Sequence, residues 1–384
     1  MTSSMHQLPP PQLVQTSAEL IAMLDRVLAQ PRVAVDTEAD SLFSYYHKVC
    51  LIQFSIPGLD YLVDPLALAD LRPLGALFSS PRVEKVFHAG ENDILMLQRD
   101  YGFQFTHLFD TMLAARILGW PHVGLAALLR ERFGVELDKR MQRTDWGRRP
   151  LSPEQLTYAR LDTHYLLPLR DRLYEELLAR HRWEEAQDAF TALSKIEFVD
   201  KPFDPDGFWR IEGIRQLNGR QLAVLRELYL WREECARCAD LPPFKIASSR
   251  VLILLSQRQP TTLRALRQFP GLSSLVCNHF SFELLSAIRR GQVAPIPTPP
   301  QRLSSEGSRP DAATQARYEA LRCWRTRQAA KRKVDPDLVL TNEVLWQIAR
   351  RNPQSFEELA QIGLLSPWKL RTYGPALLAV LAER

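Results

Sequence analysis

The chain has 384 residues, 46% hydrophobic and 24% charged, a composition typical of a globular protein with two or three domains. The lack of any uncharged apolar run of 18 residues argues against a membrane protein, and the N-terminal segment MTSSMHQLPPPQ lacks the basic and apolar regions of a secretory signal. Five cysteines argue against a disulfide framework and favour a reducing compartment, so we expect a cytoplasmic protein without membrane partners.

The net charge of +5 is unevenly distributed along the chain. Residues 1–200 carry 21 Lys and Arg against 27 Asp and Glu, a net of −6, whereas residues 201–384 carry 28 against 17, a net of +11. An acidic half joined to a basic half suggests cation-dependent chemistry in the first and polyanion binding in the second. Arg-rich helices that merely solvate their outer faces remain the alternative.

Strand and helix patterns in the first 200 residues predict an α/β domain with a mixed sheet. Strands are expected at residues 13–15, 33–35, 49–54, 61–63 and 85–88. Helices are expected at residues 16–29, 65–78, 93–99, 111–118, 124–133 and 153–180. A capping box of Thr16 and Glu19 begins the first of these helices, whose expected apolar face is Leu20, Ile21, Leu24 and Leu28.

The second half of the chain is predicted to be helical and duplicated. A shift of 93 residues superposes Trp231-Arg232 on Trp324-Arg325 and Val251-Leu252 on Val344-Leu345, with further matches in the same register. Proline-rich segments at 201–212 and 291–310 read as linkers, the second of them flexible. The domains expected are therefore residues 1–205, 210–292 and 312–384, with a Pro-rich linker at 293–311.

Candidate chemistry rests on four acids and a tyrosine. Asp36 and Glu38 follow the buried strand segment 33–35 two residues apart, and side chains at that spacing point to the same side of a strand. Asp93 falls in the first turn of a helix that a strand precedes, and Tyr158 and Asp162 share a helix face. Each has a plainer explanation: acids in a solvated turn, an acid that complements a helix dipole, or a tyrosine packed in the core.

Taken together, the four carboxylates suit hard cations such as Mg²⁺ or Mn²⁺, which prefer oxygen ligands. Two such ions roughly 4 Å apart can hold the attacking and leaving oxygens of a phosphodiester during hydrolysis. A nearby tyrosine hydroxyl can orient the attacking water.

These motifs, in order, resemble a known family. The pattern D-x-E, an Asp in the context H-A-G-x-x-D, and Y-x-x-x-D resemble the three exonuclease motifs of the DEDD superfamily in its tyrosine branch. The stretches from Leu137 to Leu151 and from Leu161 to Pro168 are similar to those of the ribonuclease D family, and the duplicated helical part is similar to HRDC domains. The resemblance covers nearly the whole chain.

The resemblance implies a ribonuclease-H-like exonuclease domain, with a mixed sheet flanked by helices, followed by two all-α HRDC-type domains. It implies a metal-dependent 3′-to-5′ exoribonuclease that releases 5′-mononucleotides from RNA with a free 3′ end, typically tRNA precursors. Carried over by position, Asp36, Glu38, Asp93 and Asp162 would bind two Mg²⁺ or Mn²⁺ ions and Tyr158 would orient the water. We expect a monomer. The alternatives are a DNA 3′-5′ exonuclease and a non-catalytic nucleic-acid-binding scaffold.

Substrate contacts are sought among aromatic and basic residues, since a single strand is bound by stacking and by backbone contacts. Near the acids, the candidates are His88, Tyr46, Trp146 and Arg143, the last in a basic loop before the Tyr158 helix. In the second helical domain the candidate is Trp324, beside a cluster of Arg and Lys. Ordinary packing or a solvated loop remains the alternative for each.

Overall fold

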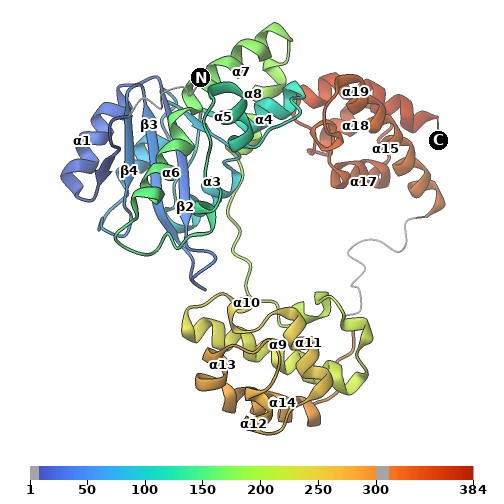
Figure 1. The fold of residues 1–384 in the computed structure, drawn as a ribbon. Coiled ribbons are helices and arrows are strands. Elements are labelled where there is room, and N and C mark those ends of the chain that lie inside the picture. The colour runs from blue at the N-terminus through green and yellow to red at the C-terminus, as the bar shows by residue number, and fades with distance from the viewer. Residues whose placement is uncertain (1–7, 300–310, 384) are drawn as a thin grey trace. The chain divides into compact units, whose positions relative to one another are not determined.

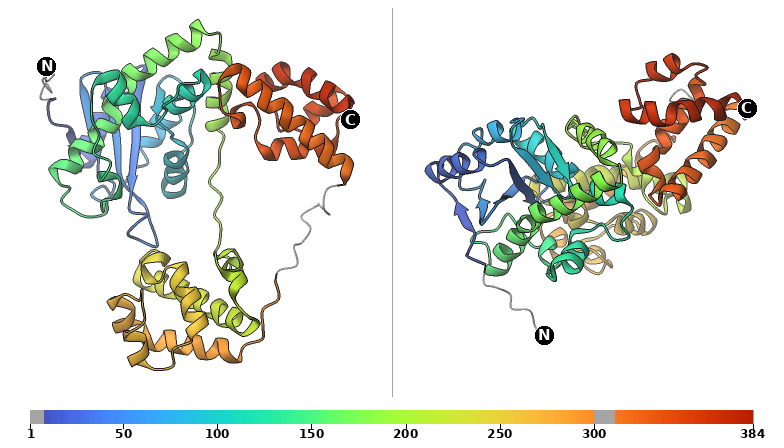
Figure 2. Two further views of the ribbon diagram at one scale, coloured as in Figure 1. Left: turned by 45° about the vertical axis from the view of Figure 1, so that its right-hand side comes forward. Right: turned by 90° about the horizontal axis from the view of Figure 1, so that it is seen from above.

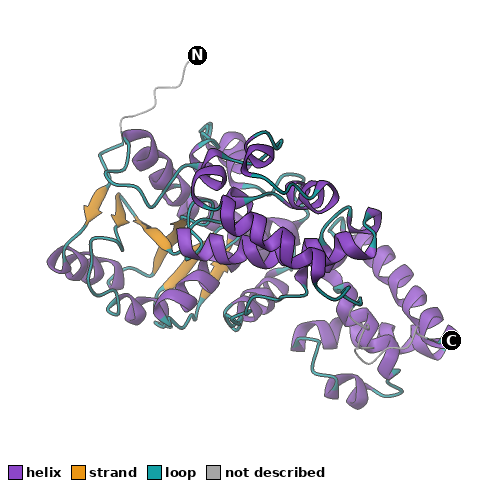
Figure 3. Cartoon of the chain, turned by 90° about the horizontal axis from the view of Figure 1, so that it is seen from below, coloured by secondary structure: helices purple, strands orange, loops and turns teal. Residues whose placement is uncertain are grey.

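The computed structural model describes residues 8–299 and 311–383. Within these ranges the chain forms two compact units, the first built on residues 8–39, 49–198 and 311–383 and the second on residues 40–48 and 199–299. All strands of the described residues lie together in the first unit, and the other regular elements described are helices (Figure 3). No helix in the described ranges is both long and apolar enough to cross a membrane.

The first unit contains a six-stranded mixed sheet in the order β1-β4-β3-β2-β5-β6. The strands are β1 (Gln12–Val14), β2 (Arg32–Ala39), β3 (Val49–Ile56), β4 (Leu59–Val63), β5 (Glu84–Phe87) and β6 (Leu108–Asp110). β2, β3 and β4 form an antiparallel meander, whereas β5 runs parallel to β2. The mixed sheet is confirmed, although β6 was not predicted.

Helices cover both faces of this sheet (Figures 1 and 2). The helices of this part are α1 (Ser17–Leu28), α2 (Leu74–Phe78), α3 (Glu91–Tyr101), α4 (Thr111–Leu118), α5 (Leu125–Phe133), α6 (Pro153–His164), α7 (Leu166–Ala179) and α8 (Trp183–Leu193). One core packs the sheet against α1, α2 and α3, and another packs it against α4 and α7. α6 lies over β3 and β4 on the face opposite α1 and α3, where Tyr158 packs with Leu51 and Leu62.

Two of the predicted helices differ from the structure. The helix expected at 65–78 is limited to α2, because the side chains of Asp64 and Asp70 accept backbone N–H groups two residues on and make turns instead. The helix expected at 153–180 breaks at Tyr165 into α6 and α7. Pro168 has no N–H for the carbonyl four residues earlier, which explains the break.

The capping box of Thr16 and Glu19 is confirmed at the start of α1. Its buried face, however, is formed by Leu20, Met23, Leu24 and Val27. Ile21 and Leu28 are 48% and 41% exposed, so the apolar face expected for this helix differs from its buried face at these two positions. The apolar stripe is rotated because α1 packs on the sheet along its i, i+3, i+4, i+7 row.

The C-terminal helices belong to the first unit. They are α15 (Ala312–Arg332), α16 (Pro336–Val339), α17 (Asn342–Arg351), α18 (Phe356–Gln361) and α19 (Pro367–Ala382). Charged contacts join them to α4 and α8: the Arg332 guanidinium bonds Glu185, and Arg116 lies 2.7 Å from Asp337. The Lys333 carbonyl oxygen also lies against Gly119, and a Cβ added to this glycine would be only 2.3 Å from that oxygen.

The second unit repeats the same helical pattern. Its helices are α9 (Gly219–Ala239), α10 (Pro243–Ile246), α11 (Ser249–Arg258), α12 (Leu263–Arg267), α13 (Ser274–His279) and α14 (Ser281–Val293). α9, α10 and α11 begin 93 residues before α15, α16 and α17, which supports the duplication. The expected linker at 201–212 is partly folded, since Phe208 is fully buried in this core. Of the expected linker at 293–311, residues 300–310 lie outside the described residues.

A buried charged cluster fixes α6 on the sheet. The carboxylate of Asp60, on β4, lies 2.6 Å from the Arg160 guanidinium and 2.9 Å from the His164 ring. It also accepts a 2.7 Å hydrogen bond from Ser55 on β3. Burial opposes ionisation of Asp60, but the bonds from His164 and Ser55 outweigh it and lower its pKa.

We predict that Asp60→Asn destabilises the chain by about 3 kcal/mol, because it leaves the buried Arg160 guanidinium without its countercharge. The free energy of unfolding measured by urea denaturation checks this. Asp70→Asn removes a carboxylate from the exposed pair with Arg72 and should change stability little. Equal losses in the two variants would contradict the anchoring role.

Candidate active site

Three carboxylates meet where β2 passes under α6. Asp36 and Glu38 come from β2 and Asp162 comes from α6, and one oxygen of each lies within 4.8 Å of the other two. The i, i+2 spacing on the strand turns both β2 acids toward the helix. The predicted proximity is confirmed for these three, while their role as metal ligands stays a prediction.

Asp93 is held beside this group by β2 itself. It lies in the first turn of α3, and its Oδ1 accepts the Thr37 N–H at 3.1 Å and the Thr37 hydroxyl. Its charge raises the pKa of both Asp36 and Glu38, so it lies within electrostatic reach of both. It is not part of the three-carboxylate group.

The turn that carries Asp93 is shaped by Asp110, which the sequence reasoning missed. Asp110 ends β6, caps α4 through the Leu113 N–H, and accepts the Gly90 N–H at 2.8 Å. Ala89 there has a φ of 59°, and a Cβ at Gly90 would lie 2.6 Å from Phe87. An Asp directly before a predicted helix was the available signal.

Crowding and burial shift the titration of all four acids. Burial, followed by the charges of Asp93 and Asp162, raises the pKa of Asp36 well above its ordinary range. Burial and the same two neighbours raise the pKa of Glu38. Burial raises the pKa of Asp93 to about 6 and that of Asp162 to about 8. The metal-free site therefore holds protons near neutral pH, and a cation would displace them.

Tyr158 lies one turn before Asp162 on α6 and is 5% exposed. Its hydroxyl hydrogen-bonds the Asp162 carboxylate, which partly offsets the effect of burial on that acid. Burial, together with the charges of Asp162 and Glu38, raises the pKa of the Tyr158 hydroxyl, so it stays protonated and able to donate.

The predicted substrate contacts fare differently. His88 follows β5, with Nδ1 2.9 Å from the Thr111 hydroxyl, and burial lowers its pKa to about 4. Arg143 is exposed in a short 3₁₀ helix (Met141–Arg143) before α6. Tyr46 is 59% exposed but belongs to the second unit, where its N–H bonds Asp240.

The two tryptophans predicted as substrate contacts are buried in the structure. Trp146 is 1% exposed, with its ring 6.2 Å from that of Tyr158, so it has no open face for a base. Trp324 is 5% exposed and packs edge-on against Tyr373 inside the C-terminal helical core. Sequence spacing placed both beside charged residues but could not show which way the rings turn.

The donor set fits a hard divalent cation. Carboxylate oxygens alone are the ligands that Mg²⁺ and Mn²⁺ prefer, and a nitrogen or sulfur donor would have favoured zinc. Among the described residues, the group of Asp36, Glu38 and Asp162 is the one cluster of three or more candidate metal ligands.

The sheet, the acids on its central strand and the repeated helical domain define a 3′-5′ exonuclease with C-terminal HRDC domains. The 3′-5′ exonuclease family matches residues 11–178, and the HRDC domain matches twice, at 221–288 and 314–381. These two matches are offset by the 93 residues of the predicted duplication.

Known proteins specify the family further. Ribonuclease D of Gluconacetobacter diazotrophicus is 30% identical over 378 residues, which cover 97% of this chain and 93% of that protein. The crystal structure of Escherichia coli RNase D, described as an exoribonuclease involved in structured RNA processing, superposes with a TM-score of 0.64 at 28% identity, over 98% of this chain and 99% of that one. The chain belongs to the ribonuclease D family, whose members are 3′-5′ exoribonucleases that depend on divalent metal ions.

Eukaryotic relatives match over a shorter part. The exosome complex exonuclease RRP6 of Saccharomyces cerevisiae is 35% identical over 265 residues, 65% of this chain and 36% of the yeast protein. The matched part spans about a third of the length of such exosome relatives, 29% in the homologue from Caenorhabditis elegans.

We predict that Asp162→Asn changes how the stability of the metal-free protein depends on pH. Because burial raises the folded-state pKa of Asp162 to about 8, the folded chain keeps a proton that the unfolded chain releases, and stability falls as the pH rises from about 4 to 8. The variant has no proton to lose there. In EDTA its free energy of unfolding should therefore exceed that of the wild type by an amount that grows up to pH 8, by at most about 1.4 kcal/mol per pH unit. Urea denaturation from pH 5 to pH 8 measures this, and parallel curves would contradict the assignment.

Proposed function

We propose that this protein is a metal-dependent 3′-to-5′ exoribonuclease that releases 5′-mononucleotides and trims the 3′ ends of tRNA precursors and other structured RNAs. The observation that carries the proposal is the convergence of Asp36, Glu38 and Asp162 within 4.8 Å beside Asp93. Membership of the ribonuclease D family supports RNA as the polymer, and the E. coli relative is described as processing structured RNA.

In this proposal, Asp36, Glu38, Asp93 and Asp162 hold two Mg²⁺ or Mn²⁺ ions. When bound, such ions lower the pKa of the attacking water and neutralise charge on the scissile phosphate. The Tyr158 hydroxyl, which remains protonated beside Asp162, orients that water by a hydrogen bond. The strand β2 keeps Asp36 and Glu38 at a fixed separation, since these residues pair with Gln53 and Leu51 of β3.

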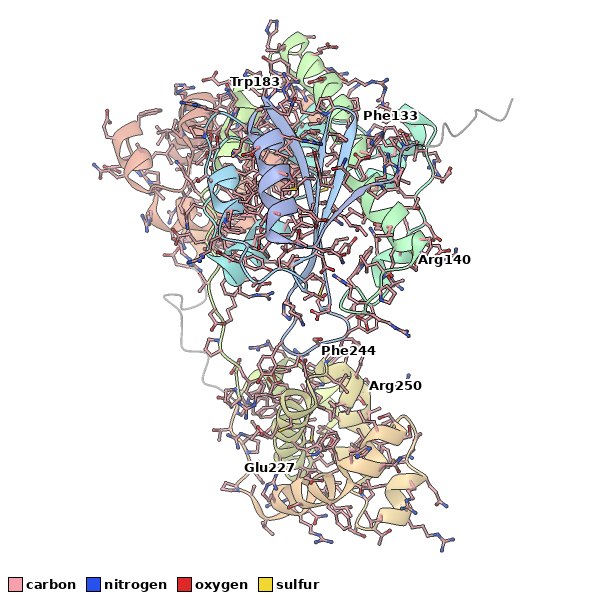
Figure 4. The ribbon with its side chains drawn as sticks, turned by 90° about the vertical axis from the view of Figure 1, so that its left-hand side faces the viewer. Phe133, Arg140, Trp183, Glu227, Phe244 and Arg250 are labelled. Carbon is pink, nitrogen blue, oxygen red and sulfur yellow. The ribbon has the colours of Figure 1, made fainter. Side chains whose placement is uncertain are left out.

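The basic loop before α6 supplies a path for phosphates toward the acids. Arg149 in this loop is committed to Asp64 and the Cys50 carbonyl, both at 2.7 Å, and Arg140, at the outer edge of the unit in Figure 4, pairs with Asp138. Arg143 is exposed and no ion pair holds it within the described part of the chain, which leaves it to contact RNA. His88, which burial keeps neutral at physiological pH, is proposed as a sugar or base contact at the end of β5.

The proposed division of the chain is a catalytic domain of residues 1–205 and two helical domains of residues 210–292 and 312–384. The two helical domains are proposed to hold the body of the RNA. The HRDC matches and the basic balance of this half support that role. In the second copy, the Arg325 guanidinium bonds the Leu340 carbonyl and that of Arg332 bonds Glu185, so both stabilise the fold. The exposed Arg327 and Lys331 are therefore the RNA contacts proposed in this domain. The enzyme is proposed to act as a monomer in the cytoplasm, where its free cysteines stay reduced.

The decisive experiment compares matched RNA and DNA oligomers, with free and blocked 3′ ends, in Mg²⁺, Mn²⁺ or EDTA. We expect 5′-mononucleotides from free-ended RNA only, and only with a divalent ion. Asp36→Asn should reduce this activity by several orders of magnitude while RNA binding persists, because it removes a metal ligand and leaves the fold. Equal cleavage of DNA would favour a DNA exonuclease, and binding without cleavage by the wild type would favour a non-catalytic scaffold.

We predict that Tyr158→Phe lowers kcat by about 10²-fold with little change in Mn²⁺ affinity, because it removes the hydroxyl that orients the water and leaves the carboxylates in place. Single-turnover kinetics and calorimetric Mn²⁺ titration measure the two effects separately. A parallel loss of metal affinity would assign the tyrosine to holding Asp162 instead.

A further inference from the structure

Gln53 lies at the middle of the sheet, next to the candidate active site. It is fully buried on β3, directly opposite Asp36 on β2 and opposite Leu62 on β4. Side chains directly opposite one another on antiparallel strands have Cβ atoms about 5 Å apart. The Gln53 amide is therefore within reach of the Asp36 carboxylate.

The same face of β3 is covered by α6. Leu51 and Ser55, two residues to either side of Gln53, point as it does. Leu51 packs with Tyr158 and Ala159 of α6, and the Ser55 hydroxyl lies 2.7 Å from that of Thr163. Gln53 thus lies on the face of the sheet that α6 covers, and β2 and α6 are the two elements that carry the three clustered carboxylates.

Both polar atoms of the Gln53 amide lack a hydrogen-bond partner among the residues that the structure describes. Most buried polar side-chain atoms in proteins are hydrogen-bonded, so this amide requires an explanation. Gln155, another buried glutamine, bonds the Ser152 N–H, the Thr144 hydroxyl and the Asp145 carbonyl. The Gln155 amide therefore has hydrogen-bond partners for its oxygen and its nitrogen, whereas the Gln53 amide, opposite Asp36, has none among the described residues.

The acids of the site differ in whether a side chain donates a hydrogen bond to them. Thr37 donates its hydroxyl to Asp93, and Tyr158 hydrogen-bonds Asp162. No side chain of the described residues donates a hydrogen bond to Asp36. Metal-ligating carboxylates are ordinarily hydrogen-bonded by a neighbouring group that fixes their orientation.

We propose that Gln53 is a positioning residue for Asp36: when Asp36 binds a divalent ion, the buried Gln53 amide directly opposite it donates a hydrogen bond to its carboxylate and fixes its orientation. This inference rests on the proposed function of the site. It explains why a fully buried amide that has no hydrogen-bond partner among the described residues lies directly opposite Asp36. An apolar side chain of equal length would fill the same space without an unpaired polar group.

Gln53→Met tests the proposal. Leu62→Met is the matched control, because Leu62 is the residue of β4 that pairs with Gln53. For Gln53→Met we expect an unchanged or higher Tm in EDTA, a Kd for Mn²⁺ raised 10- to 100-fold by calorimetry, and a similar rise in the Mn²⁺ concentration that half-saturates RNA cleavage. Cleavage at saturating Mn²⁺ should stay close to the wild-type rate. Leu62→Met should leave the Mn²⁺ affinity unchanged.

Wild-type Mn²⁺ affinity in Gln53→Met would overturn the proposal. So would a fall in the Tm measured in EDTA that matches the loss of affinity, since the amide would then serve the fold rather than the metal site. A wild-type protein that binds no Mn²⁺ would overturn the proposed metal site as well, whereas a defect confined to Gln53→Met supports both.

Discussion

The structure depends on holding mutually repelling carboxylates together. Asp36, Glu38 and Asp162 place oxygens within 4.8 Å of one another, and Asp93 adds a fourth charge nearby. Such an arrangement costs stability unless protons or cations occupy it. The fold opposes the repulsion with a central strand paired on both sides and with α6, which the Asp60 cluster fixes to β3 and β4. The paired strands and the anchored helix α6 therefore keep the carboxylates close together.

Much of this site could be predicted from the sequence, because local geometry fixes it. An i, i+2 spacing on a strand and an i, i+4 spacing on a helix decide which side chains share a face, and Asp36, Glu38, Tyr158 and Asp162 follow those rules. The mixed sheet and the duplicated helical domains were also predictable, since hydrophobic periodicity and a constant shift of 93 residues are properties of the chain itself.

Other features depend on packing that no local pattern contains. Trp146 and Trp324 stand beside basic residues in the sequence, but their burial depends on which helices cover them. The role of Asp110 depends on Gly90, 20 residues away, reaching its carboxylate. Gln53 reads as an ordinary residue in a strand, and only the register of β3 against β2 places it opposite Asp36. The structure therefore adds the contacts between residues that lie far apart in the sequence.

The most direct test of the account is the number of protons that Mn²⁺ binding releases. Titration calorimetry of the metal-free chain at pH 7, in two buffers with different ionisation enthalpies, measures that number. Because burial and neighbouring charges raise the pKa of Asp36, Glu38 and Asp162, we expect Mn²⁺ to displace at least about one proton per chain. Binding without proton release would contradict the claim that the fold holds these acids against their repulsion until a metal arrives.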